Sequence, residues 1–229
     1  YAGRWLRVWE MGPAEGRGGE EAVVLVHGWA GQAAQLSAFA EPLVAAGYRV
    51  VAFDAPAHGL SDGDRTDMID FAGAVLQVAG QACPVRGVIA HSFGSPAVAL
   101  ALRHGLGAGR VVCIAPPTSL EIYSRVVSRF VGLPERARAR MQARVEKRFG
   151  LAWRDLETHR LLSQAAAARP LDLLVVHDSA DREVPWSNGA RIAEAVPGAR
   201  MLTTNGLGHN KLLRDPATVG QIVDFLRND

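Results

Sequence analysis

Short apolar runs alternate with longer amphipathic stretches along almost the whole of this 229-residue chain. The apolar runs, which are typical of strands buried on both faces, lie at residues 23–26, 49–53, 87–90, 110–114 and 171–176, with a weaker sixth run at 201–204. The amphipathic, Ala-rich stretches lie at residues 32–46, 66–81, 95–104, 187–196 and 215–226. Strand and helix in strict turn indicate βαβ units. We therefore predict an α/β fold: a mostly parallel, doubly wound sheet with helices on both faces and an edge strand at residues 5–9.

One stretch interrupts this alternation. Residues 118–168 contain no strand-like run, and prolines punctuate both borders. Ten Lys and Arg against five Asp and Glu give positions 121–160 a net charge of +5. We predict a helical insertion above the strand ends, where α/β sheets bind ligands. The core domain would then comprise residues 1–117 and 169–229.

Composition narrows the class of protein. The net charge is only +2, which argues against a nucleic-acid-binding protein. The two cysteines cannot make a disulfide framework or a structural zinc site. No apolar run approaches the roughly 20 residues of a membrane-spanning helix. We expect a cytoplasmic, globular protein, although the first residue is Tyr1 rather than Met, which is compatible with a segment that precedes it.

Ser92 follows the strand at residues 87–90 in the string A-H-S-F-G and precedes a helical stretch. A nucleophile elbow needs this context: a tight strand-to-helix turn with small residues two positions before and after the serine. Ala90 and Gly94 fill those positions, with Ala90 in place of the more usual Gly. Ser92 is thus a candidate nucleophile, and the alternative is a serine that only caps the helix.

A nucleophilic serine needs a base and a group that orients the base. In this architecture the acid and then the histidine follow the serine in the chain, each after a later strand. His209 lies in the Gly-rich loop after residues 201–204. Two carboxylates, Asp178 and Asp181, follow the strand at 171–176, and Asp178 could equally hold its own turn.

Acyl transfer also needs N–H donors aimed at the developing oxyanion. The string His27-Gly28-Trp29 follows the strand at 23–26, which places the N–H of Trp29 near the same sheet edge. The second donor would be the N–H of Phe93, directly after the nucleophile. We expect His27 to fix this loop by hydrogen bonds. The side chains of Trp29 and Phe93 either line an acyl pocket or pack in the core.

The remaining candidates point to no cofactor and no metal. The glycine-rich residues 105–110 precede a strand and lack the final Gly of a dinucleotide loop. His58, His91 and His177 lie near strand ends, and we expect structural roles for them. Arg136, Arg140, Arg144 and Arg148 share one helix face, more typical of a solvated surface than of a gate for acidic substrates.

Five motifs, in this order, make the chain resemble the α/β-hydrolase superfamily over nearly its whole length. They are V-L-V-H-G-W (24–29), F-D-A-P-A-H-G-L-S (53–61), A-H-S-F-G (90–94), H-D-S-A-D-R-E-V-P (177–185) and G-L-G-H (206–209). The resemblance implies an α/β-hydrolase fold in which residues 118–168 form the helical cap that selects substrates. The chain starts close to the family's second strand, so one edge strand is expected to be short or absent.

By the same resemblance, Ser92 is the nucleophile, His209 the base and Asp181 the acid, with the N–H groups of Trp29 and Phe93 forming the oxyanion hole. A serine nucleophile argues against haloalkane dehalogenases and epoxide hydrolases, whose nucleophile in this superfamily is Asp. We therefore predict a cofactor-free serine hydrolase that cleaves a small carboxylic ester. Its activity should fall as the pH drops through roughly 6–7, where imidazoles become protonated.

Two alternatives remain open. An acyl-CoA thioesterase is favoured slightly by the basic cap, because CoA is anionic. A hydrolase-like protein that binds a small ligand without turnover is the other, because a fold does not determine a function.

Overall fold

The computed structural model describes residues 1–13, 18–150 and 152–227. Its sheet has the strand order β1-β3-β2-β4-β5-β6-β7. The strands are β1 (Val8–Met11), β2 (Ala22–Val26), β3 (Arg49–Phe53), β4 (Val85–His91), β5 (Arg110–Ile114), β6 (Asp172–Asp178) and β7 (Arg200–Thr204). All neighbouring pairs from β3 to β7 are parallel, and β1 pairs antiparallel with β3. The predicted doubly wound, mostly parallel sheet is confirmed.

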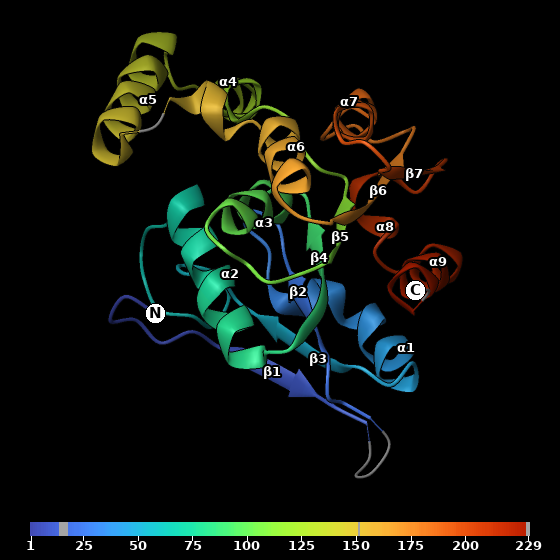
Figure 1. Cartoon of the computed structure of the whole chain (residues 1–229). Coiled ribbons are helices and arrows are strands. Elements are labelled where there is room, and N and C mark those ends of the chain that lie inside the picture. Colours follow the sequence, from blue (N-terminus) through green and yellow to red (C-terminus); the bar gives the residue numbers. More distant parts are fainter. Residues whose placement is uncertain (14–17, 151, 228–229) are drawn as a thin grey trace.

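Helices cover both faces of this sheet (Figure 1). They are η1 (Ala33–Phe39), α1 (Ala40–Ala45), α2 (Met68–Ala82), α3 (Gly94–Arg103), α4 (Leu120–Phe130), α5 (Glu135–Phe149), η2 (Trp153–Leu156), α6 (Thr158–Ala168), α7 (Ser187–Ala195), α8 (Gly208–Lys211) and α9 (Pro216–Arg227). Side chains of α2, α3, α6 and α7 form one core cluster, and those of η1, α1 and α9 form the other.

The continuous apolar runs follow from this two-sided burial. In β2, Val24 and Val26 point into the first cluster, whereas Val23 and Leu25 point into the second. All four side chains are at most 1% exposed. Because successive side chains in a strand point to opposite faces, every position must be apolar when both faces are covered.

The edge strand differs from the expectation. It spans Val8–Met11 instead of residues 5–9, and all four of its side chains are exposed. Only β3 flanks it, and Trp5 is 85% exposed. An apolar/polar alternation predicts a strand less sharply at an edge, because no buried face determines where pairing begins.

Residues 118–168 form α4, α5, η2 and α6, between β5 and β6. Figure 1 shows α4 and α5 beyond the layer made by α2 and α3. The last helix, α6, packs on α3, and Leu161 and Leu162 are fully buried in the first core cluster. This segment is therefore divided between outlying helices and one helix of the core layer. That it works as a substrate-selecting cap stays a prediction.

The order in which strands are added to the sheet reverses between the parallel neighbours β2 and β4. From β2 the chain proceeds outward to β3, and after β4 it proceeds the other way to β5, β6 and β7. The connections after β2 and β4 consequently go to opposite faces, and in doubly wound sheets ligands bind at the carboxyl ends of the strands at such a point. The loop at residues 27–31 and Ser92 both lie at this switch point.

Candidate active site

Ser92 sits between the end of β4 and the start of α3 with a φ of 48°, in the left-handed region. A non-glycine residue there is strained and is retained only where its surroundings determine it. The N–H of Ser92 donates to the carbonyl of Ile114 (2.8 Å), and its carbonyl accepts from the N–H of Ser95 (2.9 Å). Ser92 is 5% exposed. The turn is thus held from β5 on one side and from α3 on the other.

Glycines lie where the turn of Ser92 packs against the backbone at the end of β2. A Cβ at Gly94 would lie 2.7 Å from the carbonyl oxygen of His27 and 2.8 Å from that of Val26. A Cβ at Gly28 would lie 3.0 Å from the Cβ of Ser92. At position 94 the close atoms are backbone oxygens, so only glycine fits there, whereas the contact at position 28 is tight but less restrictive.

Two buried histidines hold the loop after β2. His27 is fully buried; its Nδ1 donates to the carbonyl of Gly28 (2.7 Å), and its Nε2 accepts from the N–H of Ala55 (2.9 Å). Burial lowers the pKa of His27 to about 4, so the ring is neutral at pH 7. The Nε2 of His58 accepts from the N–H of Ala30 (3.0 Å). These contacts agree with the expectation that His27 fixes this loop.

The residues predicted to donate to the oxyanion lie side by side. The rings of Trp29 and Phe93 are 5.1 Å apart in an edge-to-face arrangement, and both contact further aromatic rings. Phe93 is 8% exposed and Trp29 is 44% exposed. Phe93 is the N-cap of α3, whose N-terminal N–H groups favour a negative charge.

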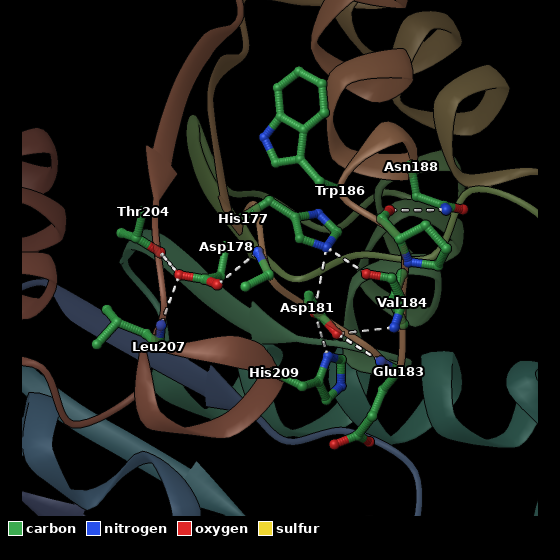
Figure 2. Close-up of polar contacts among 12 residues, drawn as sticks. His177, Asp178, Asp181, Glu183, Val184, Trp186, Asn188, Thr204, Leu207 and His209 are labelled. Carbon is green, nitrogen blue, oxygen red and sulfur yellow. Dashed lines mark hydrogen bonds and ion pairs between the residues drawn. The ribbon is translucent and has the colours of Figure 1, made fainter.

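His209 and Asp181 are paired in the structure (Figure 2). The Nδ1 of His209 lies 2.7 Å from Oδ2 of Asp181, and both side chains are buried. The Oδ1 of Asp181 accepts from the N–H groups of Glu183 (2.8 Å) and Val184 (3.0 Å). Because Nδ1 of His209 donates its proton in a hydrogen bond to the carboxylate, Nε2 keeps a lone pair that can accept a proton.

Asp178, the competing carboxylate, is used within its own turn. Its Oδ1 accepts from the N–H of Ala180, and its Oδ2 accepts from the hydroxyl of Thr204 and the N–H of Leu207 (Figure 2). Burial raises the pKa of Asp178, but these hydrogen bonds outweigh burial and lower it overall. Asp178 therefore ties the turn after β6 to the loop that carries His209.

His91 links Ser92 to His209. The His91 and His209 rings are 4.8 Å apart, and Nε2 of His91 donates to the carbonyl of His209 (3.1 Å). Burial and the neighbouring His209 lower the pKa of His91 to about 3, so this ring also stays neutral. In the described part of the chain, no hydrogen bond joins the hydroxyl of Ser92 to His209.

His177 is a contact of this site that the sequence did not reveal. Its Nε2 lies 3.3 Å from Oδ2 of Asp181, the same oxygen that His209 contacts. Burial raises the pKa of Asp181, but hydrogen bonds from His177, His209 and the N–H of Val184 outweigh it and bring that pKa well below its usual range. The available signal was the spacing of His177 four residues before Asp181 in a turn, where the two side chains can meet.

The described residues contain no group of three or more His, Cys, Asp or Glu that could hold a metal ion. Within the same residues, no helix combines the length and apolar character needed to cross a membrane.

Comparisons of the structure agree with the architecture. An esterase from Exiguobacterium antarcticum superposes with a TM-score of 0.72 at 15% identity, covering 99% of this chain and 97% of that one. The enol-lactonase from Burkholderia xenovorans LB400 superposes with a TM-score of 0.69 at 20% identity, covering 99% of this chain and 98% of the lactonase. The thioesterase domain from the curacin biosynthetic pathway superposes with a TM-score of 0.69 at 16% identity, covering 100% of this chain and 97% of that domain. At these identities the likeness establishes the fold.

Among curated protein sequences, none matches the chain significantly. The sequence profile of the Alpha/beta hydrolase family, by contrast, matches residues 23–221, which cover all of the sheet except β1 and the first residue of β2. Together with the sheet order and the serine turn at its switch point, this match shows that the chain belongs to the alpha/beta hydrolase family.

Proposed function

We propose that this protein is a serine hydrolase that cleaves a small carboxylic ester through an acyl-enzyme on Ser92. The observation that carries the proposal is the 2.7 Å contact between His209 and Asp181 beside the strained turn of Ser92. Membership of a hydrolase family supports it.

In the first half of the reaction, the hydroxyl of Ser92 attacks the ester carbonyl while Nε2 of His209 takes its proton. The negative charge that develops on the carbonyl oxygen is stabilised by the N–H groups of Trp29 and Phe93. Asp181 holds the imidazole in the tautomer that leaves Nε2 free and stabilises the imidazolium. The C–O bond of the ester then breaks, and the alcohol leaves with the proton from His209.

In the second half, His209 removes a proton from water, which attacks the acyl-enzyme carbonyl. The bond to Ser92 breaks, the carboxylic acid leaves, and the proton returns to the Ser92 oxygen. The missing contact between Ser92 and His209 is compatible with this sequence, because catalytic hydrogen bonds often tighten only in the substrate complex.

The direct test is the intact mass of the protein after incubation with a small fluorophosphonate. We expect one adduct on the wild type and on Ser187→Ala, a matched control at an exposed serine, and none on Ser92→Ala. Hydrolysis of p-nitrophenyl acetate should fall on the order of 10⁶-fold in kcat for Ser92→Ala. An unlabelled but folded wild type would instead favour a hydrolase-like protein that binds its ligand without turnover.

An acyl-CoA thioesterase is the second candidate, and one observation favours it. Arg136, Arg140 and Arg144 are exposed on α5, and no described side chain forms an ion pair with them. Such a row of guanidinium groups suits an anionic substrate such as CoA. A KM that rises with salt for acyl-CoA but not for a neutral ester would favour this candidate over the first.

A further inference from the structure

Asp181 lies between two imidazoles (Figure 2). His209 approaches Oδ2 from α8 at 2.7 Å, and His177 approaches the same oxygen from β6 at 3.3 Å. The side chains of His177 and Asp181 are both 0% exposed. The serine mechanism accounts for the contact with His209 and leaves the contact with His177 without a role.

The surroundings of His177 determine where its proton lies. Its Nε2 is 2.9 Å from the carbonyl oxygen of Val184, which can only accept a hydrogen bond, so Nε2 carries the proton. Its Nδ1 is buried without a partner among the described residues. A Cβ at Gly189 would lie 2.5 Å from that Nδ1, so α7 closes against this side of the ring. Nδ1 therefore has no acceptor to donate to, and Nε2–H is the donor of this ring.

We propose that His177 is a positioning residue: its one Nε2–H is shared between the carbonyl of Val184 and Oδ2 of Asp181, and this second donor on Oδ2 limits how strongly that oxygen holds His209. The proposal rests on the hydrolase mechanism above, because it assigns His177 an effect through the general base. His177 itself touches neither the substrate nor Ser92 in this scheme.

The physical reason is competition for one oxygen. The N–H groups of Glu183 and Val184 occupy Oδ1, so both imidazoles depend on Oδ2. A carboxylate oxygen that already accepts one hydrogen bond stabilises a neighbouring imidazolium less. With His177 in place, protonated His209 is stabilised less, so the neutral ring that acts as the base persists to lower pH. Without that donor, Asp181 would stabilise protonated His209 more strongly, and activity would need a higher pH.

The other ionisable groups around His209 stay unchanged in the test. Asp181 and His91 contact His209 itself, Glu183 contacts the neighbouring Asn210, and Asp178 holds the N–H of Leu207. A displacement of the pH profile in a His177 variant therefore reports the lost donor.

Two variants separate the donor from the bulk of the ring. The amide nitrogen of His177→Gln can take the place of Nε2, whereas the shorter His177→Asn places its amide near Nδ1. We expect the acid limb of kcat/KM for p-nitrophenyl acetate to stay in place in His177→Gln. In His177→Asn we expect the acid limb to move up by roughly one pH unit. At pH values below the limb, kcat/KM should then be about tenfold lower than in the wild type, and at high pH the two should be equal. His104→Gln, at an exposed histidine, is the matched control.

The proposal is overturned if the acid limb moves in both variants, moves in neither, or moves toward lower pH. An equal loss of kcat/KM at every pH also overturns it, because a purely structural role would produce that result. Should His177→Asn not fold, ¹⁵N NMR of the wild type decides: a protonated Nε2 on His177 supports the proposal and an unprotonated one overturns it. The rate of fluorophosphonate labelling, followed against pH in the same variants, tells the two proposals apart. A wild type that takes no label contradicts the hydrolase mechanism, whereas labelling with unmoved limbs contradicts only the role of His177.

Discussion

The carbonyl oxygens of His27, just after β2, and of Val26, at the end of β2, leave no room for a side chain at position 94. Gly94→Ala would place a Cβ 2.7 Å and 2.8 Å from them, and backbone cannot move aside as a flexible side chain can. We expect a loss of roughly 1–3 kcal/mol in the free energy of unfolding, typical of overpacking. We also expect slower fluorophosphonate labelling, because the displaced turn carries Ser92. Urea unfolding and labelling rates measure the two effects.

Gly80→Ala is the matched control for this substitution. Gly80 is exposed within α2, and a Cβ there would meet no atom within 4 Å. Alanine in a helix interior is more favourable than glycine by about 0.5–1 kcal/mol, so this variant should gain stability and label normally. Equal stability of the two alanine variants would contradict the close contact assigned to Gly94.

Single residues also show where sequence reasoning reached the site and where it stopped. Order along the chain predicted Ser92 and His209 and left Asp178 and Asp181 as alternatives, between which the resemblance favoured Asp181. The structure pairs Asp181 with His209 directly. The role of His177 was not predicted beyond a structural one. Its contact with Asp181 depends on how the turn after β6 closes, and that turn is shaped by backbone hydrogen bonds that no single residue type announces.

At the scale of elements, two-sided burial explains what was predictable. Strands with both faces covered appear as continuous apolar runs, and their positions were predicted to within a few residues. The predicted helix at residues 32–46 is in fact η1 followed by α1, with Pro42 in the first turn of α1. The edge strand was misplaced because its exposed side chains carry no comparable pattern.

The arginines of α5 permit a prediction about this helix. Arg136, Arg140 and Arg144 are exposed, in contrast to Arg138, which is buried and bound to Glu135; the side chain of Arg148 lies outside the described part. Replacing the three exposed arginines together by Gln should leave stability within about 0.5 kcal/mol and kcat/KM for a neutral ester unchanged. Steady-state kinetics on p-nitrophenyl acetate and on an acyl-CoA, each at low and high salt, check this.

The outcome on acyl-CoA chooses between the two proposed substrates. A KM that rises in the triple variant only for acyl-CoA, and whose salt sensitivity disappears with the arginines, would make thioesters the better assignment. Unchanged kinetics on both substrates would leave α5 as a solvated surface. A matched charge-conserving variant, with Lys at the same three positions, would distinguish net charge from the bidentate geometry of guanidinium.

For the whole molecule, the sheet topology explains why the candidate site residues lie at the same end of the sheet. Four connections begin at the carboxyl ends of parallel strands: the loop after β2, the turn after β4, the turn after β6 and the loop after β7. They bring Trp29, Ser92, Asp181 and His209 together from positions up to 180 residues apart. The buried histidines His27 and His91 sit between these connections, so the assembled site and the stability of the fold depend on the same neutral rings.

That dependence predicts how stability varies with pH. Burial lowers the pKa of His27 to about 4 and that of His91 to about 3, whereas unfolded histidines titrate near 6.5. Between these values the unfolded chain binds more protons than the folded protein, so acid favours unfolding. The stability from these two rings is complete above about pH 6.5 and is lost as the pH falls toward 4 and 3. Near pH 5 the slope should be roughly 2–3 kcal/mol per pH unit.

Urea unfolding at pH 7, 6 and 5, followed by tryptophan fluorescence, measures this slope. Replacing His27 by Gln should remove about one of the two protons and roughly halve the slope between pH 6 and 5, whatever it does to stability at pH 7. His104→Gln, at an exposed ring, should leave the slope at its wild-type value. A wild-type slope near zero in this interval would mean that the folded protein protonates His27 and His91 as readily as the unfolded chain does. The loop after β2 and the carbonyl of His209 would then lack the neutral partners on which the assembled site depends.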